Sequence, residues 1–304
     1  MRGVAARLEC RGPRPWDEAR EWLRGFGRPA RTLQGDATDP PPAFAGFSFT
    51  GRPAPAWGLP AGVVLVPALE WRRGADGRGF TTTWRLAESD ERDAVEARVS
   101  PRSSAAGPDA PSEQWDHAVQ EVLREIRSGS VEKVVLARSR AVALARPVDP
   151  AAAFAALREA HPACYRFLYW DEGGALFLGA SPERLVSLRG GVVRADAVAG
   201  TAAIDGAGGN APRLLDQPKD RREQELVRRA VLEAIGAVCS DVSAPDTPSL
   251  QELRHLVHLR TEVVGTAPTG THVLDLVARL HPTPAVAGTP LDVALRLIES
   301  LEPR

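Results

Sequence analysis

The residue in this chain whose type and setting best fit chemistry is Lys133. It lies within the apolar, β-branched run VEKVVLAR at residues 131–138, which predicts a buried strand. By the period of two, three apolar side chains share its face: Val131, Val135 and Ala137. Only Lys133 and Lys219 are lysines among the 38 basic Lys and Arg residues. Because a desolvated lysine can lose its proton and an arginine in a protein cannot, Lys133 is a candidate base; the alternative is a strand-end lysine whose ammonium extends into solvent.

A carboxylate continues the apolar side of a second predicted element, a helix over residues 218–238. The apolar stripe of that helix consists of Leu226, Val227, Ala230, Val231, Ala234, Ile235 and Val238. Glu223 lies three and four residues before the first two of these, and Lys219 lies one turn earlier. A carboxylate near a helix N-terminus is favoured by the helix dipole and can bind a hard cation such as Mg²⁺. The alternative is an i,i+4 ion pair between Lys219 and Glu223.

Three further positions could contact a ligand. Glu183 stands in GASPERL (residues 179–185), just past a predicted strand and a proline-set turn, where a rigid loop can present a general acid; an exposed surface glutamate is the alternative. The segment HPTPAVAG at residues 281–288 is a proline-stiffened turn of small residues, which lets backbone approach a ligand. His258 is either a ligand hydrogen-bonder or a satisfied core histidine.

Composition limits the class of protein. The 304 residues suffice for one large or two ordinary domains, and a net charge of −1 does not suggest a nucleic-acid or membrane surface. Cys10, Cys164 and Cys239 are widely spaced, which argues against zinc sites and disulfide frameworks. We find no signal peptide and no apolar run of membrane-spanning length. We therefore expect a soluble cytoplasmic protein without nucleic-acid or membrane partners.

Periodicity and turn signals predict an alternation of helices and strands. Helices are expected at 16–23, 112–128, 150–160, 218–238 and 291–301, and strands at 44–49, 131–138, 164–171, 175–179 and 192–197. A hairpin is expected from 63–71 and 80–86 around the turn at 74–77, whereas 255–264 and 273–280 alternate less cleanly. We predict a divergent N-terminal region at 1–111, ending in a loop at 100–111, and a catalytic domain at 112–304.

Six blocks in order resemble the family of chorismate-utilising enzymes. They are VEKVVLAR, GASPERL, the AGT of residues 199–201, KDRREQE, VHLRT and LHPTPAVAG. The resemblance covers residues 112–304 strongly and 44–86 faintly, and within the family the pattern is most similar to that of isochorismate synthases. It implies an α+β fold of antiparallel β-sheets flanked by helices, and a monomer that binds chorismate.

The resemblance also implies a role for each matching position. Lys133 matches the base that activates water for attack at C2 of chorismate, and Glu183 the acid that protonates the departing C4 hydroxyl. Glu223 matches a ligand of Mg²⁺, the implied cofactor, which holds the ring carboxylate. The remaining matches are to substrate-binding positions: Gly200 and Thr201 at the carboxylate, His258 at the ring, and Ala285 and Val286 in the pocket wall. The product would be isochorismate, for menaquinone or siderophore biosynthesis.

Two features distinguish the subgroup, and one feature departs from the family. Aminating relatives typically lack the lysine and carry an FP-x-G-T type block where this chain has HPTPAVAG; salicylate synthases share the lysine but usually differ at that block. A salicylate synthase, an aminating enzyme and an inactive fragment are the alternatives. Family members continue past the helix at 291–301 with a glycine-rich turn, an arginine, a lysine and a second glutamate for Mg²⁺. We therefore expect the 304-residue chain alone to be inactive, with an exposed sheet edge.

Overall fold

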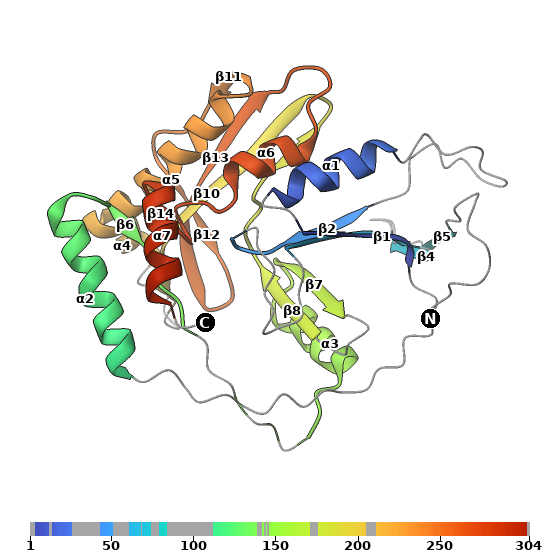
Figure 1. Cartoon of the computed structure of the whole chain (residues 1–304), viewed down its shortest axis with the longest axis horizontal. Coiled ribbons are helices and arrows are strands. Elements are labelled where there is room, and N and C mark those ends of the chain that lie inside the picture. The colour runs from blue at the N-terminus through green and yellow to red at the C-terminus, as the bar shows by residue number, and fades with distance from the viewer. Residues whose placement is uncertain are drawn as a thin grey trace. The chain divides into compact units, whose positions relative to one another are not determined.

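The computed structural model describes residues 4–11, 14–25, 43–50, 61–67, 69–73, 79–83, 112–138, 142, 144, 146–170, 176–204 and 211–302. They belong to two compact units, one containing the elements before residue 101 and the other those from residue 112 onward (Figure 1). The predicted turn at 74–77, the loop at 100–111 with the domain boundary, and the stretch 205–210 lie outside the described residues.

The first unit contains a three-stranded antiparallel sheet and a hairpin. The sheet order is β1 (Val4–Cys10), β3 (Gly62–Pro67) and β2 (Phe44–Phe47). The helix α1 (Pro15–Gly25) confirms the helix that we predict at 16–23 and buries Ala19 completely. The strands β4 (Leu69–Arg73) and β5 (Gly79–Thr83) pair antiparallel, so a hairpin occurs, but the first strand predicted for it at 63–71 is divided: residues 62–67 form β3 and pair with β1 and β2 instead.

The second unit is organised around two long antiparallel strands, β10 (Val192–Ala203) and β13 (Leu256–Thr266). The short strand β9 (Ser187–Arg189) pairs with β10, and β11 (Ser240–Ser243) and β12 (Ser249–Glu252) pair with β13. Buried and less buried residues alternate along β13, as expected for a strand with one face against a core.

The helix α5 (Pro218–Gly236) covers the core face of this sheet. Its buried residues are Gln224, Val227, Val231 and Ile235, spaced three and four apart as one face of a helix requires. The strand side of the same core consists of Val193, Ala195, Ala197, Ala199 and Val263. The small alanines let the helix approach closely, and each buried Val or Ile side chain contributes roughly 1.5–3 kcal/mol to stability.

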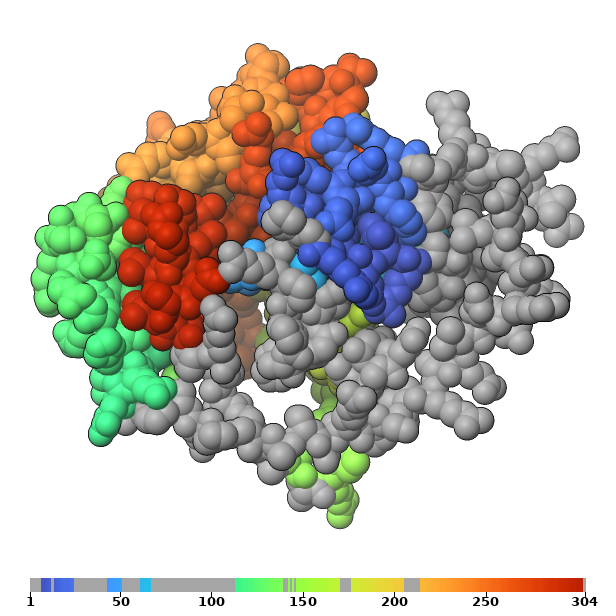
Figure 2. Space-filling model, viewed as in Figure 1, coloured from blue at the N-terminus to red at the C-terminus, as the bar shows by residue number. Residues whose placement is uncertain are grey.

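Several predicted elements have the bounds that periodicity predicts. The helices α2 (Ser112–Ser128), α3 (Pro150–Ala160) and α7 (Leu291–Leu301) are confirmed. The strands predicted at 164–171 and 175–179 occur as β7 (Tyr165–Trp170) and β8 (Leu176–Ser181), which pair antiparallel. Two short helices complete the unit, α4 (Ala211–Asp216) and α6 (Val273–Leu280). The surfaces of α2 and α7 adjoin (Figure 2). Every strand pair among the described residues is antiparallel, which confirms the predicted fold class.

The strand that we predict at 131–138 is much shorter than expected. Only β6 (Lys133–Val134) is a strand, paired with β14 (Gly288–Thr289). A run of β-branched residues becomes a strand only where a neighbouring strand accepts its hydrogen bonds, and β14 offers two residues. Among the helices that the structure describes, none combines the length and apolarity needed to cross a membrane.

Candidate active site

Lys133 and Glu223 form an ion pair across the second unit. Lys133 Nζ donates a hydrogen bond to Glu223 Oε1 at 2.7 Å, and the two side chains are 14% and 31% exposed. Lys133 is therefore not a lysine whose ammonium extends into solvent. Nor does Glu223 pair with Lys219, which is exposed. The two residues that the sequence singles out independently are direct partners.

The backbone around Lys133 is held by the end of the HPTPAVAG turn. Lys133 is paired with Thr289, and the flanking amides of Glu132 and Val135 donate to the carbonyls of Thr289 and Ala287 at 2.7 and 2.8 Å. Gly288 has a φ of +149°, and a Cβ there would overlap the carbonyl oxygen of Lys133. The turn therefore approaches the backbone of Lys133 closely, whereas its predicted approach to a ligand stays a prediction.

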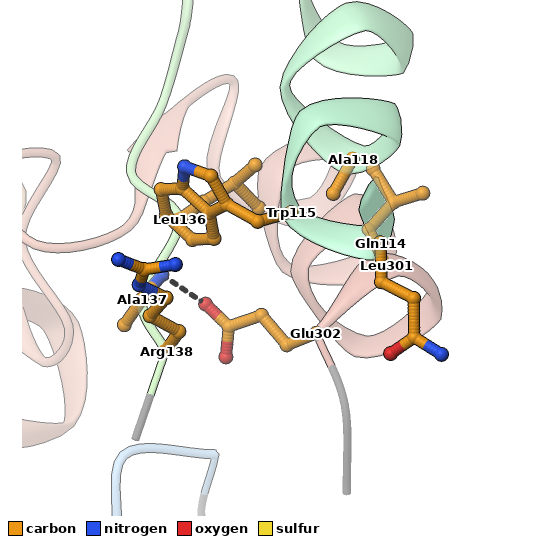
Figure 3. A pocket seen from close by; sticks show the side chains of 8 residues that line it. All are labelled: Gln114, Trp115, Ala118, Leu136, Ala137, Arg138, Leu301 and Glu302. Carbon is orange, nitrogen blue, oxygen red and sulfur yellow. Dashed lines mark hydrogen bonds between the residues drawn. The ribbon is translucent and has the colours of Figure 1, made fainter. Parts of the chain in front are cut away.

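The other end of the same segment is fixed by α2 and α7 (Figure 3). The amide of Ala137 donates to Glu302 Oε1 at 2.7 Å, and the Arg138 guanidinium lies 5.5 Å from the centre of the Trp115 ring. The cleft between these side chains has a volume of only about 10 Å³, which is room for a single water at most. This cleft is therefore an anchor for the Lys133 segment and too small for a substrate.

Gly200 places the end of β10 against the first turn of α5. Its φ is +77°, and a Cβ there would lie 3.1 Å from the Cβ of Asp220, one helical turn before Glu223. The register of β10 against β13 shifts between Ala199 and Thr201. A side chain at position 200 would need both a strained backbone and a shift of α5, so glycine is required for this contact.

The register shift aligns Thr201 with His258. Thr201 Oγ1 and His258 Nδ1 are hydrogen-bonded at 2.8 Å. Burial lowers the pKa of His258 below its ordinary value, although a hydrogen bond with the backbone of Gly200 acts in the opposite direction. His258 is therefore a partly buried imidazole that favours the neutral form, with Thr201 and Gly200 as its neighbours.

Glu183 lies just after β8, in the turn that follows Ser181. Burial, and then the negative charge of Asp196, raise the pKa of its carboxyl group, so the protonated form is favoured relative to an exposed glutamate. Glu183 is partly buried, which argues against an ordinary surface glutamate. Among the described residues no hydrogen bond or ion pair joins it to Lys133 or Glu223.

The two remaining predicted positions differ in exposure. Ala285 packs against the core between α5 and the sheet, whereas Val286 is 47% exposed. The next residue in the chain is Ala287, whose carbonyl accepts the hydrogen bond from the amide of Val135. The predicted pocket wall is therefore continuous in sequence with the backbone that holds Lys133.

Sequence reasoning missed two residues that set up this region. Gln224 is buried on α5 and donates from Nε2 to the carbonyl of Ala197 and to Thr261 Oγ1, both at 3.0 Å. It lies three residues before Val227, so its spacing could have revealed it. Asp196 is 5% exposed and is the neighbour that helps to raise the pKa of Glu183; no local signal distinguishes it from an ordinary strand residue.

Comparisons with known proteins show which family the chain resembles. The salicylate biosynthesis isochorismate synthase of Pseudomonas aeruginosa is 38% identical over 193 residues, which are 62% of this chain and 40% of that relative. A Bacillus anthracis structure, assigned as the 2,3-dihydroxybenzoate-specific isochorismate synthase DhbC, has a TM-score of 0.73 at 26% identity and covers 99% of this chain and 74% of its own. The menaquinone-specific isochorismate synthase MenF from Escherichia coli has a TM-score of 0.66 at 28% identity, covering 82% of this chain and 62% of its own.

The chain is shorter than its curated relatives. It spans between 40% and 62% of the length of three of them. A family model described as chorismate binding enzyme nevertheless matches residues 2–304, almost the whole chain. With the antiparallel fold and the ordered blocks around Lys133, Glu183 and Glu223, this match shows that the chain belongs to the family of chorismate-binding enzymes.

Proposed function

We propose that the protein is an isochorismate synthase, which converts chorismate to isochorismate by adding water at C2 and losing the hydroxyl at C4. The observation that carries this proposal is the buried Lys133, held by Glu223 and by the backbone of residues 287–289. The relatives named above are assigned to different pathways and share the isochorismate synthase activity, which supports the reaction without deciding the pathway.

Lys133 acts as the base. Its amine takes a proton from the attacking water, whose oxygen forms the new bond to C2 while the ring double bonds shift. An ammonium that donates to Glu223 cannot accept a proton, so the reactive form of the site is one in which this ion pair has opened and Lys133 has given a proton to solvent. Arginine at this position would keep the charge and lose the reaction, because its guanidinium does not release a proton.

Glu183 acts as the acid. Its protonated carboxyl group gives a proton to the C4 hydroxyl, which leaves as water, so that one water is taken up and one is released. Burial and the charge of Asp196 both favour the protonated form that this step needs. The absence of a direct contact between Glu183 and Lys133 in the described residues suits two groups that act on different carbons of the ring.

Gly200, Thr201 and His258 bind the substrate. The exposed Thr201 hydroxyl and the backbone at Gly200 offer hydrogen bonds to a carboxylate, and His258, which favours the neutral form, offers a hydrogen bond to a hydroxyl of the ring. Ala285 and Val286 form an apolar wall. These contacts orient the ring between base and acid.

Glu223 fits one ligand position of an Mg²⁺ ion. Mg²⁺ commonly uses one or two protein carboxylates together with water and substrate oxygens, and Glu223 offers one partly exposed carboxylate. Within the described residues no group of three His, Cys, Asp or Glu side chains could hold a metal by itself. We therefore assign only Glu223 to the ion, which when bound would neutralise and hold a carboxylate of the substrate.

The test is product analysis of chorismate incubated with Mg²⁺ and with a protein in which residues 1–304 are extended by the C-terminal segment of a relative. Chromatography should show isochorismate in equilibrium with chorismate, and a coupled lactate dehydrogenase assay should detect no pyruvate. Stoichiometric pyruvate with salicylate would identify a salicylate synthase instead. An ammonium-dependent fluorescent anthranilate product would identify an aminating enzyme, and either result overturns the proposal.

A further inference from the structure

A second cavity lies on the polar face of the β10–β13 sheet, on the side opposite α5. Its volume is about 380 Å³, and it is bounded by the connection between α3 and β7 at residues 162–165 and by Pro182. Its polar lining comes from Arg184, Asp196, Gln251 and Arg260. Neither Lys133 nor Glu223 lines this cavity. A volume of this size accommodates a small organic ligand.

The two arginines of the cavity do not use all their hydrogen-bond donors for Asp196 and Glu262. Arg184 and Arg260 each use a single nitrogen, Nη2, for their hydrogen bonds to Asp196 and Glu262, at distances from 2.6 to 3.3 Å. The Nε–H of Arg184 is buried and has no hydrogen-bond partner. The two guanidinium groups are matched by the two carboxylates of Asp196 and Glu262, so the feature that favours an added anionic oxygen is the unpartnered Nε–H of Arg184. A buried charged donor without a partner is costly, and an anionic oxygen would satisfy it.

Gln251 provides the complementary acceptor. It is paired with His258 in the β12–β13 register, and its Nε2 donates to the carbonyl of Pro182 at 3.1 Å. That hydrogen bond fixes the amide orientation, which leaves Oε1 as the acceptor. Oε1 is buried and has no hydrogen-bond partner. The cavity therefore offers one orphaned acceptor beside the orphaned donor of Arg184, and both require a partner that the protein does not supply.

We propose that this cavity is a second ligand site, separate from Lys133 and Glu223, which binds a small hydroxy-carboxylate anion. The carboxylate accepts hydrogen bonds from the free nitrogens of Arg184 and Arg260. The hydroxyl donates to Gln251 Oε1. An ammonium group could donate to the same oxygen, but it would bring a further cation beside the guanidinium groups of Arg184 and Arg260 that line the cavity, so we assign the donor as an uncharged hydroxyl. The proposal concerns binding and does not depend on the reaction that the protein catalyses.

The test compares ligands that differ in one group. The probes are the 2-, 3- and 4-hydroxybenzoates, benzoate without the hydroxyl, and phenol without the carboxylate, titrated into the 304-residue chain by calorimetry. At least one hydroxybenzoate should bind with one-to-one stoichiometry, and benzoate should bind about tenfold more weakly, because Gln251 Oε1 then stays unpaired. Phenol should show no binding. Equal affinity for benzoate and for all three hydroxybenzoates, or no binding of any hydroxybenzoate in the millimolar range, overturns the proposal.

Variants locate the site. Gln251→Met should weaken the hydroxybenzoate about tenfold and leave benzoate unchanged, because only the hydroxyl loses its acceptor. Gln114→Met, which changes a glutamine at the cleft of Figure 3, should change neither affinity. Lys133→Ala should leave the hydroxybenzoate affinity as it is. If Lys133→Ala abolished binding while thermal unfolding showed a folded protein, the probe would occupy the site around Lys133 and the second site would be refuted.

Discussion

Lys133 Nζ lies 2.7 Å from Glu223 Oε1, although 90 positions separate the two residues in the chain. One comes from a two-residue strand and the other from the second turn of a long helix. Among the described residues, each group has the other as its ionic partner. Opening this pair frees a carboxylate oxygen for a cation, and the released ammonium becomes a base once it has given one proton to solvent, so the two proposed roles are coupled through one hydrogen bond.

Replacing Lys133 by arginine tests its role as a base. All activity measurements use residues 1–304 extended by the C-terminal segment of a relative. In that protein Lys133→Arg keeps a positive charge beside Glu223 and cannot accept a proton, so turnover of chorismate should fall by about 100-fold or more, as far as in Lys133→Ala. Chorismate binding, measured by calorimetry, should persist. Lys219→Arg, which changes the other lysine at an exposed position, is the control and should retain full activity. Substantial activity in Lys133→Arg would make Lys133 an electrostatic group and exclude it as the base.

Variants of two glutamates on α5, Glu223 and Glu225, distinguish a metal ligand from a surface carboxylate. Glu223→Gln should weaken Mg²⁺ binding in a calorimetric titration, because the amide is neutral and a poorer ligand for a hard cation. Glu225 is 58% exposed and pairs with Arg228 at 3.2 Å, so Glu225→Gln should leave the affinity unchanged. Lys133→Met should bind Mg²⁺ more tightly than the unchanged protein, because the ammonium no longer occupies Glu223. Equal affinities in all four proteins would assign Glu223 a structural role only.

The helices could be predicted from the sequence because their signals are local. The apolar spacing of α2, α3 and α7 lies within eleven to seventeen residues, and the structure has the same bounds. The helix α6 was not predicted, because it has eight residues and its N-cap is His272, which is not among the usual N-cap residues. A short helix with an unusual cap gives a weak signal even when its capping box is complete.

The strand β13 was not predicted because a buried polar pair interrupts its pattern. Thr261 is 1% exposed, and it accepts a hydrogen bond from Gln224, which is equally buried on α5. In the sequence each of the two is a polar residue typical of a surface, whereas in the core each provides the hydrogen-bond partner of the other.

The contact between the two proposed site residues also depends on packing. The resemblance assigned Lys133 and Glu223 to one site, but their direct hydrogen bond depends on how α5 packs, which local periodicity does not specify.

Replacing Gly288 tests whether the backbone of β14 holds Lys133 in position. Gly288→Ala places a Cβ against the carbonyl oxygen of Lys133 at a φ of +149°, so β6 must shift. The backbone strain alone costs about 1–3 kcal/mol, and the melting temperature and the turnover should both fall. Gly236→Ala is the control, since no atom lies within 4 Å of the added Cβ at the end of α5 and alanine favours helix by about 1 kcal/mol. Unchanged activity in a destabilised Gly288→Ala would show that β14 supports the fold without positioning Lys133.

The pH dependence of the reaction tests Glu183. A general acid must be protonated, so activity should decline as the pH rises through the pKa of Glu183. Burial and the negative charge of Asp196 raise that pKa. Asp196→Asn removes the charge but keeps the size and a hydrogen-bond acceptor for Arg184 and Arg260. The pKa of Glu183 should fall, and the alkaline limb of the pH–rate profile should move to lower pH.

The matched control for this shift is Glu262→Gln. Glu262 accepts hydrogen bonds from the same two arginines as Asp196, but it does not contribute to the raised pKa of Glu183. Glu262→Gln should therefore leave the alkaline limb of the pH–rate profile in place while perturbing Arg184 and Arg260 to a similar extent. Thermal unfolding of both variants separates a change in the acid from a loss of fold. If Asp196→Asn moved the limb to higher pH, or if both variants moved it equally, the alkaline limb would belong to a group other than Glu183, and the proton for the C4 hydroxyl would have to come from elsewhere.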